Sequence, residues 1–302
     1  MSQAVLVGVD QHPTARDAVA LGSALAAATH DELAVAHVYP FDPMAGRIAL
    51  GAPAADPLRE EAEEIVARAV TGLAEQARRV VLGATSVAAG LHAEAERAPA
   101  ELIVVGSSHR GPVGRATLGT HATRVIHGAP CSVAIAPHGL AAHDVRLRLI
   151  GVALDGSPES YDALGLARRL AGASGAAVKL VSVLPPRVSD WGGYQLTPGR
   201  SDDDEIVRKQ AQKVLAVARP GEETEIRAGD VRDALVDLSG EVDLLVMGSR
   251  SYGPARRILL GSVSDAVVRA ARCPIVVLPR SSRDGEAEPV PASPSAAEPI
   301  AT

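Results

Sequence analysis

Short runs of Val, Ile and Leu alternate along this chain with longer stretches rich in Ala. The short runs predict buried strands, and the longer stretches, whose apolar residues recur three and four positions apart, predict helices. Five strands and four helices alternate, and then the same order begins again. Strands separated by helices indicate a parallel sheet with right-handed crossovers and helices on both faces. The pattern therefore predicts two tandem, doubly wound α/β domains, Rossmann-like in architecture, each with a five-stranded parallel sheet.

The predicted elements follow the same order in both halves. For the first half we predict strands at 4–9, 32–38, 85–89, 102–105 and 131–136, and helices at 13–29, 58–80, 91–98 and 119–127. For the second half we predict strands at 147–154, 177–184, 223–228, 242–247 and 274–278, and helices at 158–173, 202–219, 230–239 and 261–271. The segment 58–80 has acidic residues near its start and Arg78 and Arg79 at its end. This charge order is favourable for a helix dipole and therefore favours one long helix over the segment.

Internal repetition supports the division into two domains. Residues 102–137 and 244–279 are copies of one stretch, with Gly106 and Gly119 matched to glycines 142 positions further on. A polar linker at 138–146 separates the copies, so we predict domains at 1–139 and 146–280. Residues 281–302 are rich in Pro, Ala, Ser and Glu and are expected to be disordered.

Composition narrows the class of protein. The chain has 302 residues, 47% of them hydrophobic, which is enough for two cores, and its net charge of −6 argues against a nucleic-acid binder. No apolar window reaches the length of a membrane span, and the N-terminus lacks the basic region of a signal peptide. Cys131 and Cys273 are expected to be buried thiols in a reducing compartment, so we expect a cytoplasmic protein.

Candidate chemistry lies in the loop after the fourth strand of each copy. In the second copy the chain reads Gly248-Ser249-Arg250-Ser251, then nine residues, then Gly261-Ser262-Val263; in the first it reads Gly106-Ser107-Ser108-His109, nine residues, then Gly119-Thr120-His121. A strand that leads into a glycine loop and a helix can hold phosphate on backbone N–H groups. Ser262 and Thr120 could equally be simple helix caps.

Other phosphate and catalytic motifs are absent. No Gly-Lys-Ser/Thr follows these glycines, no GxGxxG follows the first strand, and no Gly-x-Ser-x-Gly elbow occurs. The histidines show no metal-ligand spacing. The arginines of the two loops, Arg110, Arg115, Arg250, Arg256 and Arg257, could screen phosphate charge or lie in solvent. A dedicated catalytic constellation is therefore not evident.

The glycine loops resemble those of the universal stress protein family, whose ATP-binding members carry Gly-x2-Gly-x9-Gly-Ser/Thr after the fourth strand. The resemblance covers both copies and includes the Asp after the first strand and Cys273-Pro274 before the fifth, which the first copy changes to Cys131-Ser132. It implies a fold of the adenine nucleotide alpha hydrolase type and bound ATP, which a divalent ion such as Mg²⁺ could accompany. It also implies that the fifth strands pair, so that the copies form an intramolecular pseudo-dimer; two chains could associate further as a homodimer.

Matching the family pattern residue by residue yields two candidate nucleotide sites. The resemblance places adenosine beside Asp155 and Val183 in the second copy, with Ala153 in the family's small-residue position. The candidates of the second copy are Ala153, Asp155, Val183, Gly248, Ser249, Ser251, Gly261, Ser262 and Val263. Those of the first copy are Gly8, Asp10, Val38, Gly106, Gly119 and Thr120.

The second motif glycine is replaced in both copies, by Ser251 and by the bulkier His109. A side chain at a position that glycine normally fills can crowd a ligand, so we predict that the second copy is the better ATP site. The sequence thus favours an ATP-binding protein with a regulatory or protective role under stress. It leaves open a nucleotide-free interaction module of the same fold, or a weak ATPase or phosphotransferase with His109 as base.

Overall fold

The structure is a computed structural model that describes residues 3–41, 57–74, 76–108, 118–185, 201–249, 258 and 260–279, without the side chains of 201–204. The first copy forms a parallel sheet in the order β3-β2-β1-β4-β5. Its strands are β1 (Ala4–Gly8), β2 (Glu32–Pro40), β3 (Arg78–Ala84), β4 (Ala100–Gly106) and β5 (Ser132–Ala136). Its helices are α1 (Ala15–Thr29), α3 (Pro57–Val70), α4 (Val87–Arg97) and α5 (Thr120–Ile126).

The second copy repeats this arrangement with the order β10-β9-β6-β7-β8, again with parallel neighbours. Its strands are β6 (Leu149–Ala153), β7 (Ala177–Leu184), β8 (Glu223–Ala228), β9 (Leu244–Gly248) and β10 (Ile275–Leu278). Its helices are α6 (Pro158–Ser174), α7 (Ser201–Val217), α8 (Val231–Leu238) and α9 (Ser262–Ala270). The predicted doubly wound α/β fold is confirmed in both copies.

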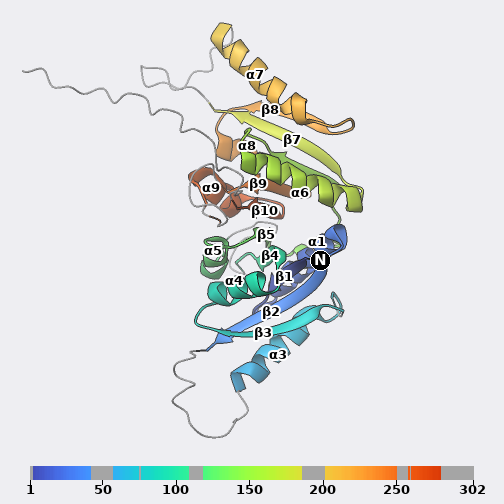
Figure 1. The fold of residues 1–302 in the computed structure, drawn as a ribbon, viewed down its shortest axis with the longest axis vertical. Coiled ribbons are helices and arrows are strands. Elements are labelled where there is room, and N and C mark those ends of the chain that lie inside the picture. The colour runs from blue at the N-terminus through green and yellow to red at the C-terminus, as the bar shows by residue number, and fades with distance from the viewer. Residues whose placement is uncertain are drawn as a thin grey trace, which may run out of the picture.

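The two sheets join into one ten-stranded sheet. The last strands of the copies, β5 and β10, run antiparallel and pair Val133 with Val277 and Ile135 with Ile275. Figure 1 shows this pairing at the middle of the molecule, with β3 and β8 toward opposite ends. Because the junction is antiparallel, the strands of one copy run opposite to those of the other, and their carboxyl ends lie on opposite edges of the sheet.

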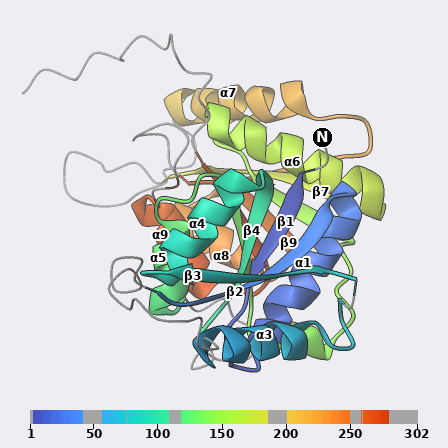
Figure 2. The ribbon, with the colours of Figure 1, turned by 60° about the horizontal axis from the view of Figure 1, so that its bottom comes forward.

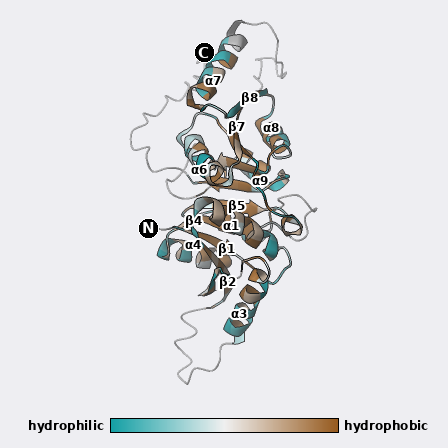
Figure 3. Cartoon of the chain, turned by 90° about the vertical axis from the view of Figure 1, so that its right-hand side faces the viewer, coloured by the Kyte–Doolittle hydropathy of each residue, from teal (hydrophilic) through white to brown (hydrophobic). Residues whose placement is uncertain are grey.

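Helices cover both faces of the sheet (Figure 2). Side chains alternate across each strand, so Val5, Val7 and Val35 pack with α1 and α3, whereas Ala34 and Ala36 pack with α4 and α5. Each of the two hydrophobic cores continues from one copy into the other. Figure 3 shows the hydrophobic colour concentrated on the strands between the helices. None of the described helices is long and apolar enough to cross a bilayer.

The linker between the copies is tied to the first of them. A short 3₁₀ turn, Leu140–Ala142, lies in the linker. The buried carboxylate of Asp17, on α1, accepts hydrogen bonds from the backbone N–H groups of Gly139 (2.9 Å) and Ala141 (2.7 Å). Helices α1 and α6 also contact each other across the junction. The linker is therefore a packed part of the molecule.

One part of the sequence prediction was wrong. The helix predicted at 58–80 ends at Val70, and the strand predicted at 85–89 is instead β3, Arg78–Ala84. Gly72 follows the helix with φ of +71°, a conformation that suits glycine and ends a helix. Ser86 accepts a hydrogen bond from the N–H of Ala89 and caps α4, so the predicted strand overlaps a helix start. The predicted tail at 281–302 lies outside the described residues.

Candidate functional site

A cavity of about 400 Å³ opens at the carboxyl ends of the central strands of the second copy. Strands β6 and β9 are neighbours at the centre of this sheet. From β6 the chain continues to β7 on one side, and from β9 it continues to β10 on the other. The gap between β6 and β9 is therefore a topological switch point, where α/β sheets usually bind ligands. Eight of the nine residues predicted for this copy line the cavity: Ala153, Asp155, Val183, Gly248, Ser249, Gly261, Ser262 and Val263. The ninth, Ser251, lies outside the described residues.

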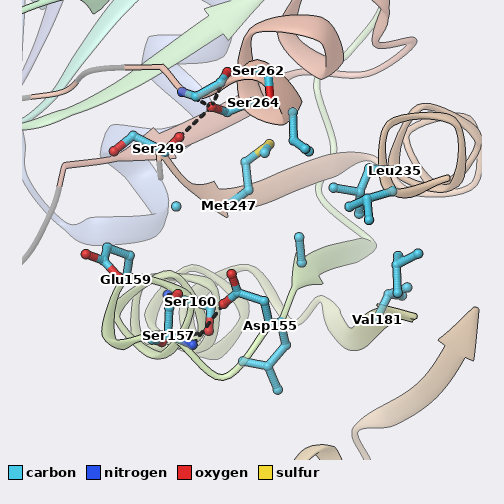
Figure 4. Close-up of a pocket in the computed structure, with 17 residues that line it drawn as sticks. Asp155, Ser157, Glu159, Ser160, Val181, Leu235, Met247, Ser249, Ser262 and Ser264 are labelled. Carbon is cyan, nitrogen blue, oxygen red and sulfur yellow. Dashed lines mark hydrogen bonds between the residues drawn. The ribbon is translucent and has the colours of Figure 1, made fainter. Parts of the chain in front are cut away.

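Asp155 stands in the loop that links β6 to α6. One of its carboxylate oxygens, Oδ1, accepts a hydrogen bond of 2.8 Å from the N–H of Ser157 (Figure 4). Ser157 is the N-cap of α6 and accepts from the N–H of Ser160. Asp155 therefore has the turn role that its position favours. Its exposed carboxylate also lines the cavity.

The apolar wall of the cavity comes from three elements. Val181 on β7, Leu235 on α8 and Met247 on β9 line the cavity (Figure 4). Val183, also on β7, lines it as well. Leu235 and Met247 were not predicted, because an isolated Leu or Met in a strand or helix is indistinguishable from ordinary core in one sequence. Apolar walls of this kind suit an aromatic ligand, which buries its faces against aliphatic side chains.

The polar end of the cavity is the first turn of α9. The hydroxyl of Ser264 donates to the carbonyl of Ser249 and accepts from the N–H of Gly261 at 2.9 Å. The same Gly261 N–H is 3.2 Å from the Ser249 carbonyl. These bonds clamp the two ends of the glycine loop together. They also engage the Gly261 N–H. The first turn of a helix leaves its N–H groups without intrahelical partners. Of residues 261–263, Ser262 and Val263 therefore have the N–H groups that could bind an anion.

Ser264 is a residue that the sequence prediction missed. Ser264 follows the N-cap residue Gly261 by three positions, which is the position from which a side chain can accept a hydrogen bond from the N-cap N–H. This spacing could have identified Ser264 from the sequence. The first copy has Ala122 at the matching place. The clamp is therefore a property of the second copy.

Gly248 allows α6 to approach the end of β9 closely. A Cβ built on Gly248 would lie 2.8 Å from the Cβ of Glu159, which is closer than real Cβ contacts. Glu159 is buried, lines the cavity and was also missed by the sequence prediction. The glycine thus has a packing role at this rim, in addition to any role toward a ligand.

The first copy has its own cavity, of about 490 Å³. Gly8, Asp10, Val38 and Gly106 line it as predicted. Gly119 and Thr120 are at the start of the short helix α5 and do not line it; His121 does. Asp10 accepts from the N–H of His12 at 2.9 Å, so it repeats the turn of Asp155. His109 lies outside the described residues.

The charges that the described residues bring to the second cavity are the carboxylates of Asp155 and Glu159. No lysine or arginine lines it among the residues that the structure describes, and the loop arginines 250, 256 and 257 fall outside them. Within the described part of the chain no group of three or more His, Cys, Asp or Glu side chains could hold a metal ion.

The two cysteines are structural thiols. Burial raises the pKa of Cys131 and of Cys273 to about 12, so neither forms a reactive thiolate near neutral pH. Extending the β5–β10 register places Cys273 opposite Pro137, six residues from Cys131. That is roughly 20 Å along the strand, far beyond the reach of a disulfide.

Comparison with known proteins identifies the family. The sequence profile of the universal stress protein family matches residues 1–137 and 147–279. The chain therefore belongs to the universal stress protein family, in a tandem form. It is similar to Universal stress protein Rv2005c of Mycobacterium tuberculosis, with 33% identity over 194 residues. This match covers 60% of the chain and 63% of the relative, so the chain spans less than two thirds of that protein's length.

A solved structure agrees on the fold. A crystal structure of a universal stress protein from Archaeoglobus fulgidus has a TM-score of 0.67 and 20% identity, and the match covers 93% of this chain and all of that one. A universal stress protein in complex with cAMP is 26% identical over a match that covers 45% of this chain and 99% of that chain, with a TM-score of 0.34.

Proposed function

We propose that this chain is an adenine-nucleotide-binding regulator of the stress response, and that its second copy is the ATP site. The observation that supports this most is the convergence of eight predicted residues, far apart in sequence, on one cavity at the switch point of β6 and β9. Membership of the universal stress protein family is consistent with this role.

In this proposal the base lies between the β7 wall and Asp155. Val181 and Val183 offer the apolar surface, and the carboxylate of Asp155 is at the open side. One carboxylate oxygen of Asp155 is engaged with Ser157. Asp155 could accept a hydrogen bond from a ribose hydroxyl or an exocyclic amine, because a carboxylate has acceptor capacity for several donors.

The phosphates lie at the start of α9, on the N–H groups of Ser262 and Val263 and on the Ser262 hydroxyl. This helix end combines unsatisfied donors with the positive end of the helix dipole. The Ser264 clamp holds the loop ends in place before a ligand arrives, which lowers the ordering cost of binding. A divalent ion such as Mg²⁺ would be held mainly by the phosphate oxygens, with Glu159 as the buried carboxylate at hand.

We further propose that the two copies work as an intramolecular pseudo-dimer in the cytoplasm. The antiparallel β5–β10 ladder and the two cores that continue between the copies support this unit. Two free, widely separated thiols, with Cys273 buried and Cys131 partly buried, suit a reducing compartment. Association of two chains into a homodimer stays a prediction, and light scattering coupled to size-exclusion chromatography tests it.

Calorimetric titration of the purified full chain with ATP tests the proposal, after removal of any co-purified nucleotide. We expect one site per chain. Gly261→Asp should abolish binding, because Gly261 has φ of −77° and Asp is a good N-cap that would preserve the helix while repelling phosphate. Gly119→Asp, at the matching position with φ of −81°, is the control and should retain binding.

Other outcomes reassign the function. Two ATP molecules per chain would mean that the first copy also binds ATP. No binding at millimolar ATP would favour a nucleotide-free interaction module of the same fold. A parallel titration with cAMP shows whether the site takes an acyclic or a cyclic phosphate.

A further inference from the structure

The two end strands of the ten-stranded sheet differ in character. Strand β3 is the last strand at one end and β8 is the last at the other, and Figure 1 shows them toward opposite ends of the molecule. Among the residues that the structure describes, no strand pairs with the outer side of either one. An end strand presents N–H and C=O groups that another chain can pair with. Each end is therefore a candidate surface for adding a strand.

The end at β8 is protected by charge. Glu225 and Arg227 lie on β8, and they form a network of ion pairs with Lys179 of β7 and with Glu241. Charged side chains on an end strand are a common means of preventing it from pairing with another sheet. The β8 end is therefore not expected to add a strand.

The end at β3 is apolar at the same places. Leu82 of β3 pairs with Val38 of β2, and Arg227 of β8 pairs with Val183 of β7. Val38 and Val183 are equivalent in the two copies, so Leu82 stands where β8 has an arginine. Two residues earlier, Val80 stands where β8 has a glutamate. Both apolar side chains are half-buried, so they keep surface that a further strand could cover.

Charge is distributed unevenly along this end of the molecule. Helix α3 packs on β2 and β3, and its start lies at the carboxyl ends of the strands, where Leu58 lines the first cavity. The first half of α3 carries one arginine, Arg59, and four carboxylates: Glu60, Glu61, Glu63 and Glu64. The amino end of β3 carries Arg78 and Arg79. This end of the molecule is thus acidic on one side and basic on the other, which makes it complementary to a second copy that runs in the opposite direction.

We propose that β3 pairs antiparallel with β3 of a second copy of this chain, about a two-fold axis at Val81. An axis at this residue pairs all seven residues of β3. Val80 then lies opposite Leu82, and Arg79 lies opposite Gly83. No arginine faces another arginine, which matters because like charges directly opposite each other destabilise a strand pair. The acidic start of each α3 lies toward the basic end of the other β3, and the two-fold symmetry closes the assembly at a dimer.

Gly83 leaves room for the arginine of the second copy. Residues that lie directly opposite in an antiparallel pair project from the same face of the sheet. A Cβ built on Gly83 would lie 2.9 Å from the Cβ of Phe41, so Phe41 lies on the face that Arg79 of the second copy would reach. Phe41 is 40% exposed, and Arg79 is exposed as well. A guanidinium group near an exposed aromatic ring is favourable, so this register gives both exposed side chains a contact.

Sedimentation velocity of the purified full chain, without nucleotide, tests the proposal. We expect a species of twice the mass of the chain. Arg79→Glu should raise the dissociation constant of the dimer about tenfold, because the two-fold axis repeats the lost attraction at both ends of the ladder. Thr224→Glu is the control, because Thr224 occupies the matching exposed position on β8. It should leave the dissociation constant unchanged.

Disulfide cross-linking tests the register. Val81→Cys would place two thiols opposite each other at the axis, within the distance that a disulfide spans. Mild oxidation should then produce a covalent dimer. Ile226→Cys, at the matching position on β8, is the control and should give no more cross-linked product than the unsubstituted chain.

The outcomes separate this proposal from the proposed function, on which it does not rest. A chain that stays monomeric at about 0.1 mM would overturn the dimer and leave the ATP site standing. A dimer that is unaffected by Arg79→Glu, or that cross-links through Ile226→Cys and not through Val81→Cys, would use another surface and would also overturn the proposal. Failure to bind ATP, with the dimer and its cross-link intact, would overturn the proposed function alone.

Discussion

At the scale of single residues, the tightest constraint at the candidate ATP site is the contact between Gly248 and Glu159. We predict that Gly248→Ala lowers the free energy of unfolding by about 1–3 kcal/mol, because the new methyl group would overlap the Glu159 Cβ at 2.8 Å. Gly165→Ala is the control: it lies within α6 with nothing within 4 Å of the added Cβ, and it should raise stability by about 0.5–1 kcal/mol. Urea unfolding measures both, and equal stabilities for the two variants would contradict this account.

The sequence identified those cavity-lining residues that belong to a motif and missed those that do not. Asp155, Gly248 and Gly261 were identified because they match the nucleotide-binding pattern of the family. Leu235 and Met247 were missed because an apolar residue that lines a cavity has the same pattern as one that fills a core. Ser264 was missed although its spacing from Gly261 carried a signal.

At the scale of elements, the linker turn depends on one buried carboxylate. We predict that Asp17→Ala costs about 2 kcal/mol of stability, because the N–H groups of Gly139 and Ala141 lose their acceptor. Asp162 is the matching residue on α6 and is half-buried. Asp162→Ala should lower the free energy of unfolding by less than about 1 kcal/mol. Thermal unfolding of both variants provides the comparison. An equal loss in both would mean that the linker contact does not stabilise the chain.

The edge strand β8 makes stability depend on pH. Hydrogen bonds from Arg227 and then Lys179 lower the pKa of Glu225 to about 2. The pKa of Glu225 in the folded protein is below its unfolded value of about 4.3. The contribution of this carboxylate to the free energy of unfolding is therefore complete above about pH 4.3 and is lost as the pH falls toward 2. The carboxylate is 36% exposed, so solvent screening limits the effect to about 1 kcal/mol or less.

Comparison of Glu225→Gln with the unmodified protein checks this expectation. Urea unfolding at about pH 6 and about pH 3 should show a smaller acid loss in the variant. An identical loss in both proteins would assign the acid sensitivity to other groups.

Element boundaries show why part of the fold could not be predicted. The helix at 58–80 was extended too far because Arg78 and Arg79 suit the end of a helix. In the structure Arg78 instead pairs with Glu32 and with the buried Glu94 across the sheet edge. These are long-range contacts that no local pattern reveals. The buried strands, with continuous apolar runs, were placed within two residues at each end.

At the scale of the whole molecule, Ile258, which lies between the two glycines of the second copy's motif, is bonded to the first copy. Ile258 is fully buried; its N–H donates to the carbonyl of Ala129 (3.2 Å), and its carbonyl accepts from Gly128 (2.8 Å). We predict that Ile258→Ala weakens ATP binding several-fold while circular dichroism stays unchanged, because the chain at 258 loses the side chain that holds it in the core. Ile206→Ala, on the exposed face of α7, is the control. Unchanged ATP affinity in Ile258→Ala would show that the loop is ordered without the first copy.

The central claim is that the second copy binds ATP at the cavity between β6 and β9. The most direct test is a crystal structure of the full chain grown with millimolar ATP. We predict density for the base between Val183 and Asp155 and for phosphate at the N–H groups of Ser262 and Val263. An empty second cavity, or ATP bound in the first copy alone, would contradict the account.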